Sequence, residues 1–204
     1  MAKTGKETIP LIQTALKGLS TVSTSNILSE QMRSSIETLE KHCHVRRECA
    51  QKDCDAVVKA YVDNGIINTS IRILNFKDPN ITVDNSDSWP ILPAYLNILK
   101  ILIGLTDASS LVCEKVAESE IIKIAINEIK TRKQKAANAC KKLDYVSYLL
   151  CLLFNIVQHS LLATQKLQEL GFAELVIPFL KENLYVFLVF WNQFILILRY
   201  LAKI

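Results

Sequence analysis

The residue types best suited to chemistry gather in one short stretch, HCHVRRECAQKDC, at residues 42–54. Imidazoles and thiols are ligands that zinc favours, and the stretch supplies five of them: His42, Cys43, His44, Cys49 and Cys54. Their spacing is unsuited to zinc, because structural sites pair cysteines two to four residues apart with a matching second pair. His42 and His44 would also point to different sides of a helix. We therefore expect no metal site here, and thiols that stay free.

A nucleophile and a base also occur together further along the chain, at Cys151 and His159. On one helix, eight residues correspond to a rise of roughly 12 Å, which is too far for direct proton transfer. The opening AKTGKET lacks the earlier glycine of a phosphate-binding loop, and no GxSxG, HExxH or GxGxxG motif occurs. The sequence thus predicts a protein that is not an enzyme and needs no cofactor.

Composition limits the fold and the compartment. The chain has 204 residues, of which 50% are apolar, with five Gly and five Pro. This favours a helical domain or short repeat array with a sizeable core over a turn-rich β-sandwich. A net charge of +4 without a single basic helix argues against nucleic acid as the partner. The first ten residues hold no apolar signal core, so we expect a cytoplasmic protein whose six cysteines are reduced.

The elements that must position any site come from an internal repeat. The segments KAYVDNGIINTSIRILN, EKVAESEIIKIAINEIK and QKLQELGFAELVIPFLK align without gaps, with offsets of 55 and 51 residues. Gly65 and Gly171 occupy the same position, where a left-handed helix end suits glycine, whereas Glu120 takes that position in the middle copy and requires a different cap. Apolar spacing predicts helices over residues 9–19, 27–43, 91–105, 110–119, 121–129, 145–157, 162–170 and 172–180. Recurrence of this kind predicts stacked helical repeats.

These segments resemble armadillo repeats over about residues 54–181. NGIINTSIRIL and LGFAELVIPFL resemble the glycine turn and second helix of that family, and YLLCLLFNIV resembles its third helix with the terminal Asn at Asn155. The resemblance implies an all-α fold, a right-handed α-solenoid of armadillo-like helix groups over residues 54–183, with an N-terminal helical cap at residues 1–53. Inserts at residues 75–90 and 131–144 lengthen the unit.

The resemblance also implies a non-enzymatic scaffold or adaptor that binds another protein through a concave surface made by the third helices. In the family, a ladder of Asn side chains binds the main chain of an extended peptide. Here Asn155 matches that ladder, while Leu102 occupies the corresponding place in the earlier copy. The polar residues expected to line the surface are Asn97, Lys100, Asn155 and Gln158. For Asn155, a local hydrogen bond at a helix end is the alternative role.

The insert at residues 131–144 and its approach are basic and contain no acid up to Asp144. The basic residues of this insert are Lys130, Arg132, Lys133, Lys135, Lys141 and Lys142. Such a run is either a solvated loop or a patch that steers an acidic partner.

Two other functions stay open. Some armadillo proteins, the guanine-nucleotide dissociation stimulators, regulate small GTPases by engaging basic, lipidated tails, and an acidic groove would favour that function here. The third reading concerns residues 184–202, a hydrophobic C-terminal helix interrupted by Asn192, Gln193 and Arg199. It is long enough to anchor the chain in a membrane, and otherwise it closes the array with an apolar outer face.

Overall fold

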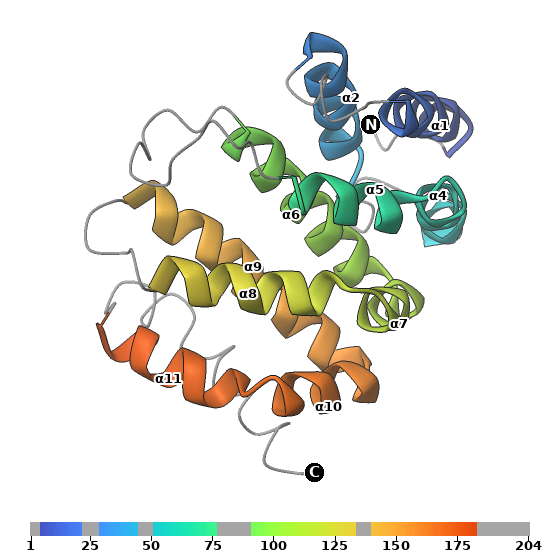
Figure 1. The fold of residues 1–204 in the computed structure, drawn as a ribbon. Helices are drawn as coiled ribbons and strands as arrows, with labels where there is room; N and C mark the ends of the chain where they lie inside the picture. The colour runs from blue at the N-terminus through green and yellow to red at the C-terminus, as the bar shows by residue number, and fades with distance from the viewer. Residues whose placement is uncertain (1–4, 22–28, 45–50, 77–90, 134–139, 183–204) are drawn as a thin grey trace. The chain divides into compact units, whose positions relative to one another are not determined.

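The fold is all-α. The computed structural model describes residues 5–21, 29–44, 51–76, 91–133 and 140–182, and these ranges contain no strand. Their helices, shown in Figure 1, are α1 (Gly5–Ser20), α2 (Glu30–Lys41), α4 (Gln51–Asp63), α5 (Ile66–Leu74), α6 (Leu92–Ala108), α7 (Ser110–Glu118), α8 (Ile121–Lys133), α9 (Cys140–His159), α10 (Leu161–Glu169) and α11 (Phe172–Glu182). Each helix predicted within these ranges is present, with somewhat different ends.

The chain forms two compact units, Met1–Ser109 and Ser110–Ile204. The first unit contains both the residues expected to form the cap and the first repeat copy. The reason lies in the packing of the first unit, where α1 contacts α2, α4 and α5, and α2 contacts α6. The segment expected to be a terminal cap therefore shares a core with the first repeat copy.

The core of the first unit follows from the apolar spacing of its helices. Met32, Ile36 and Leu39 lie on one face of α2 and are almost completely buried, as residues at i, i+4 and i+7 on an amphipathic helix should be. Ser29 caps the start of α2, because its side chain accepts a hydrogen bond from the Met32 amide at 3.2 Å. At the other end, the buried Tyr61 hydroxyl of α4 donates to the Leu39 carbonyl at 2.6 Å.

The end of α1 is closed by a basic side chain from a distant helix. Arg72 of α5 donates to the Ser20 carbonyl at 3.1 Å and also to the Leu19 carbonyl. The last carbonyls of a helix lack partners within that helix and carry partial negative charge. A guanidinium therefore both satisfies them and complements the helix dipole.

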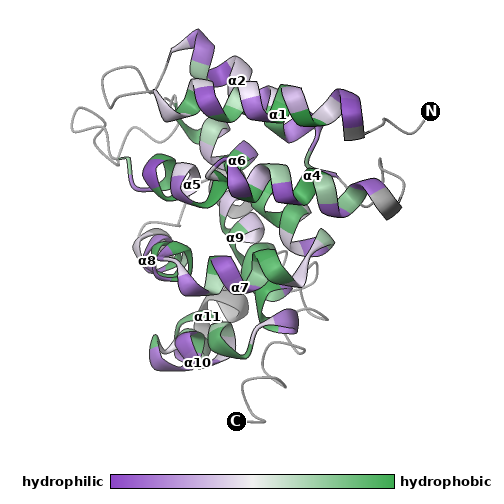
Figure 2. Cartoon of the chain, turned by 90° about the vertical axis from the view of Figure 1, so that its right-hand side faces the viewer, coloured by the Kyte–Doolittle hydropathy of each residue, from purple (hydrophilic) through white to green (hydrophobic). Residues whose placement is uncertain are grey.

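In the second unit, equivalent helices of the last two copies are neighbours. α10 contacts α7, α11 contacts α8, and α9 packs against α7, α8 and α10. Figure 1 shows α8 and α11 running in the same direction. Figure 2 shows hydrophilic and hydrophobic bands alternating along helices such as α1 and α10, the colouring of helices with one buried face. Helices at corresponding positions of the two copies therefore pack side by side within this unit.

The predicted glycine turns are confirmed. Gly65 has a φ of 80° and Gly171 a φ of 66°, and no other described residue has a positive φ. A left-handed conformation costs a residue with a Cβ roughly 1–2 kcal/mol, so glycine is favoured at both turns. The hydrogen bond that follows each turn is equivalent in the two copies. The Thr69 amide donates to the Gly65 carbonyl at 3.0 Å, and the Leu175 amide donates to the Gly171 carbonyl at 3.2 Å.

The middle copy makes this turn by different chemistry, as its Glu120 requires. The Ser119 hydroxyl donates to the Val116 carbonyl at 2.7 Å and accepts from the Ile121 amide at 3.2 Å. The Ile124 amide then donates to the Glu120 carbonyl at 2.9 Å, in the position that the other copies use. A serine side chain thus replaces the left-handed glycine while the register of the second helix is kept.

The hydrophobic segment at residues 184–202 lies outside the described residues. Within the part of the chain that is described, no helix combines the length and apolarity needed to cross a membrane.

Candidate functional site on the third helices

The third helices α6 and α9 share one pattern of burial. Each residue from Tyr95 to Thr106 in α6 has the same degree of burial, buried or half-buried, as the residue 51 positions later in α9. Both helices therefore keep a half-buried stripe at spacings of three and four. The α6 stripe consists of Leu96, Asn97, Lys100, Ile103 and Gly104. The α9 stripe consists of Ser147, Tyr148, Cys151, Phe154, Asn155 and Gln158.

According to this burial pattern, the residue of α6 that corresponds to Asn155 differs from the one expected from the sequence. The pattern pairs Asn155 with Gly104, while Leu102, the residue expected there, is fully buried. A shift of two residues rotates a position by about 200° around an α-helix. Leu102 therefore belongs to the core face of α6, and the stripe has glycine where α9 has asparagine.

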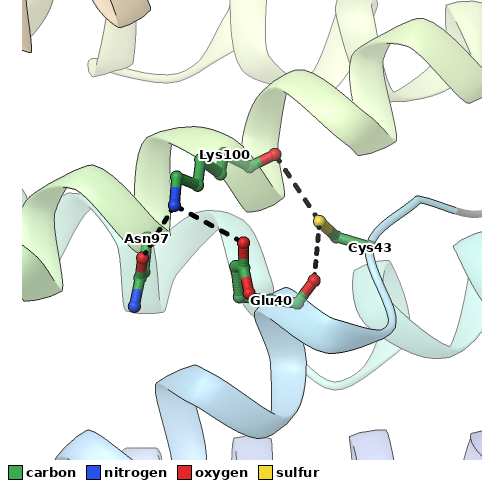
Figure 3. Close-up of polar contacts among 4 residues, drawn as sticks. All are labelled: Glu40, Cys43, Asn97 and Lys100. Carbon is green, nitrogen blue, oxygen red and sulfur yellow. Dashed lines mark hydrogen bonds and ion pairs between the residues drawn. The ribbon is translucent and has the colours of Figure 1, made fainter. Parts of the chain in front are cut away.

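Part of the α6 stripe contacts the end of α2 and the residues that follow it, and Figure 3 shows Glu40 and Cys43 beside Asn97 and Lys100. The Lys100 ammonium lies 3.6 Å from the Glu40 carboxylate of α2 and donates to the Asn97 side-chain oxygen at 3.5 Å. The Cys43 thiol lies 3.1 Å from the Glu40 carbonyl and 3.7 Å from the Lys100 carbonyl. Two of the four residues expected to line an open surface, Asn97 and Lys100, therefore face this contact.

Gly104 allows the closest approach in this contact. A Cβ built at Gly104 would lie 2.5 Å from the Cys43 carbonyl oxygen and 3.3 Å from its sulfur. Because the obstacle is backbone, no side-chain rotation could relieve it. The Lys100 and Glu40 side chains of the neighbouring ion pair remain 34% and 27% exposed. Ion pairs that are exposed to this extent contribute at most about 1 kcal/mol to stability. The close contact at Gly104 therefore constrains the packing against α6 more than the Lys100–Glu40 ion pair does.

The α9 stripe carries no charged side chain. Its two aromatic residues, Tyr148 and Phe154, are half-buried, as are Asn155 and Gln158. Burial raises the pKa of the Cys151 thiol to about 11, so this group is neutral at physiological pH. The Asn155 carbonyl accepts from the Cys113 thiol of α7 at 3.7 Å. The opposite faces of α9 are buried, for example at Leu149.

A polar cluster between α7 and α10 was not predicted from the sequence. The Ser160 hydroxyl donates to the Glu114 carboxylate at 3.0 Å and accepts from the Ala163 amide at 3.2 Å, which caps α10. Lys166 donates to the Ala117 carbonyl at the end of α7 at 2.5 Å. A serine before an apolar run does signal a helix start, but no local signal identifies Glu114, 46 residues away. These contacts hold α10 beside α7.

The described ends of the basic insert, residues 131–133 and 140–144, are helical. Lys130, Arg132 and Lys133 lie in the last turns of α8, and Lys141 and Lys142 lie in the first turn of α9. Lys135 lies outside the described residues. The expectation of a loop from residue 131 was wrong, because lysine, arginine, alanine and glutamine all favour helices. Lys130 is exposed.

The residues of the His/Cys stretch at 42–54 differ in how deeply they are buried. Cys43 and Cys54 are buried, whereas His44 is exposed, and Cys49 lies outside the described residues. Among the side chains that are described, no three His, Cys, Asp or Glu groups are arranged to hold a metal ion. The described cysteines whose state is assigned, Cys43, Cys54, Cys113 and Cys151, are free thiols.

With the fold and stripes defined, the class of this protein over its described residues is all-α. Comparison with known proteins adds no relative to this description: no family model, no curated protein and no solved structure matches the chain.

Proposed function

We propose that this chain is a non-enzymatic, armadillo-like scaffold of the cytoplasm that binds a partner protein through the α9 stripe. The observation that carries the proposal is a half-buried, uncharged row on a helix whose other faces are buried. It combines aromatic rings at Tyr148 and Phe154 with amides at Asn155 and Gln158. Aromatic groups dominate the energy of protein interfaces, and an amide supplies both a donor and an acceptor.

The repeat class is supported by the second unit taken alone. Its two copies place α10 beside α7 and α11 beside α8, and the turn of each copy opens the second helix in the same register. We infer a right-handed solenoid from these pairs together with the resemblance to armadillo repeats. The stripe on α9 is then the surface of a third helix, where that class binds its partners.

The chemistry of the stripe favours binding over catalysis. Burial raises the pKa of its thiol, Cys151, to about 11, and a protonated thiol is a poor nucleophile. The stripe also holds no carboxylate, so nothing in the stripe favours the acidic groove that a regulator of small GTPases would use for a basic tail.

The test compares binding partners of three full-length chains in cells by quantitative affinity purification. Phe154→Glu places a charge in the α9 stripe, and Gln165→Glu, at an exposed position of α10, is the control. The proposal expects at least one protein that wild type and Gln165→Glu retain and Phe154→Glu loses, with the same dependence when the purified pair is titrated. Equal retention of every partner by Phe154→Glu, with an unchanged circular dichroism spectrum, would refute it.

A further inference from the structure

We propose that residues 184–204 pack on the open flank of α11, formed by Ala173 and Ile177, as the third helix of the last repeat copy. A polar stripe that contains Asn192 and Arg199 then faces outward. This inference does not depend on the α9 stripe as a binding surface. Three observations support it: the lower burial of this flank than of its counterpart in α8, the order of helices in the other copies, and the spacing of polar residues in the segment itself.

The open flank of α11 is less buried than the same flank of α8. At the centre of the buried face the two helices agree, since Phe172 and Val176 are completely buried and the residues 51 positions earlier are 1% exposed. Beside that centre, Ile177 is 37% exposed, whereas its counterpart Ile126 is 0% exposed. Ala173, one turn before Ile177, is half-buried, whereas the residue 51 positions earlier is buried. The middle copy therefore has a cover on this flank that the last copy lacks among the described residues.

The side chains of the open flank are suited to burial. The outer face of a terminal repeat in a soluble array is normally polar, and neither Ala173 nor Ile177 supplies a polar group. The polar side of α11 lies elsewhere, at Glu174, which is exposed like its counterpart Lys123 in α8. The distribution of apolar and charged residues thus predicts the same buried arc on α11 as on α8, including the part that is open.

The segment that follows α11 has the position and length of a third helix. In the middle copy, α8 is followed by α9, which packs against α7 and α8. In the first copy, α5 is followed by α6, and the third helices α6 and α9 have 17 and 20 residues. Residues 184–204 begin one residue after the end of α11 and supply a similar length. Sixteen of the nineteen residues from 184 to 202 are apolar, which is enough to cover the open flank.

The polar residues of this segment fall on one side of a helix. Tyr185, Asn192 and Arg199 recur every seven residues, and Lys203 follows Arg199 by four, so that an α-helix would gather them in one stripe. Gln193 would lie beside this stripe. The third helices α6 and α9 share this pattern, with one less buried stripe and otherwise buried faces. A bilayer would instead leave the amides of Asn192 and Gln193 without hydrogen-bond partners, so the pattern favours α11 as the surface that this segment covers.

The first measurement is photo-cross-linking of the purified full-length chain without lipid or detergent. A photo-reactive phenylalanine analogue replaces Ile177 or, as the matched control, Glu174, whose counterpart Lys123 stays exposed in α8. We expect the analogue at position 177 to form adducts with residues 184–204 of the same chain, located by mass spectrometry. The analogue at position 174 should form several-fold fewer of them.

The second measurement tests which side of the segment is covered. Asn192→Cys and Phe194→Cys are compared, because positions two residues apart lie about 200° apart around an α-helix. Alkylation of each new thiol is followed by mass spectrometry in the native and the urea-unfolded chain. We expect Asn192→Cys to react at nearly the unfolded rate and Phe194→Cys at least about tenfold more slowly than when unfolded.

Three outcomes would overturn the inference. The first is that position 177 forms no adduct, or forms adducts only between two copies of the chain. The second is equal alkylation at positions 192 and 194. The third is a wild-type chain that floats with phosphatidylcholine–phosphatidylserine vesicles and whose two cysteine variants are equally protected there, as in a bilayer. The two measurements use different variants, so a Phe194→Cys chain that fails to fold leaves the cross-linking result decisive.

Discussion

Replacement of Gly104 by alanine tests the packing of α2 on α6. Glycine inside a helix is normally unfavourable, and alanine should stabilise α6 by about 0.5–1 kcal/mol. Here the new Cβ would lie 2.5 Å from the Cys43 carbonyl oxygen. Overpacking of this kind costs about 1–3 kcal/mol, and the backbone obstacle places Gly104→Ala toward the upper end. We expect a net destabilisation of about 1–2 kcal/mol.

The assay is urea unfolding followed by circular dichroism, with Gly18→Ala as the matched control. Gly18 also lies inside a helix, but a Cβ there meets only the Ser35 hydroxyl, at 3.2 Å. That side chain can move, so Gly18→Ala should be neutral or stabilising. A Gly104→Ala chain that is as stable as wild type, or more stable, would refute the close approach of α2 to α6.

Three further predictions concern single groups. Gly65→Ala, at a turn where a Cβ meets no atom within 4 Å, should cost about 1–2 kcal/mol through its positive φ alone, measured by urea unfolding; no loss would contradict the left-handed turn. Ser160→Ala should cost about 1–2 kcal/mol by removing the cap of α10 and the bond to Glu114, and Glu114→Gln should cost less; equal unfolding midpoints for wild type and Ser160→Ala would contradict the cluster. Because burial raises the pKa of Cys151 to about 11 from 9.0, its thiol favours folding below pH 9, and this contribution declines as pH rises from about 9 through about 11. Alkylation of Cys151, located by mass spectrometry, should therefore be slow at pH 8 and accelerate at higher pH than in an unfolded chain, and a rate at pH 8 equal to that of a model thiol would contradict the assignment.

Helix positions could be predicted from the sequence because they depend on local information. The apolar spacing around Ile36 or Leu153 repeats every three to four residues, and it needs no knowledge of distant contacts. Gly65 and Gly171 were recognisable for the same reason, since their position just after an apolar helix requires a left-handed residue. Helix ends were predicted less well: α8 and α9 extend into the basic insert, at residues 130–133 and 140–144, because charge was given more weight than helix propensity.

The contacts that define the stripes could not be predicted in this way. From the sequence, Lys100 was expected on the surface of a third helix. Its ion-pair partner Glu40 lies 60 residues earlier in the chain. Gly104 gave no signal until the Cys43 carbonyl was placed beside it. The pairing of Asn155 with Gly104 has the same 51-residue offset as the aligned segments, and the burial pattern of both helices supports it. A two-residue error in alignment leaves the apolar content of a helix almost unchanged while it rotates every side chain.

The central claim is that the α9 stripe is the surface on which a partner binds. Its most direct test is nuclear magnetic resonance of the full-length chain, with a purified partner protein that wild type retains and Phe154→Glu loses added stepwise. The account predicts that the largest chemical-shift changes fall on Tyr148, Cys151, Phe154 and Gln158, and that exposed residues of α10 such as Gln165 are unaffected. Changes centred on α10 or on α1, with the α9 stripe unchanged, would contradict it.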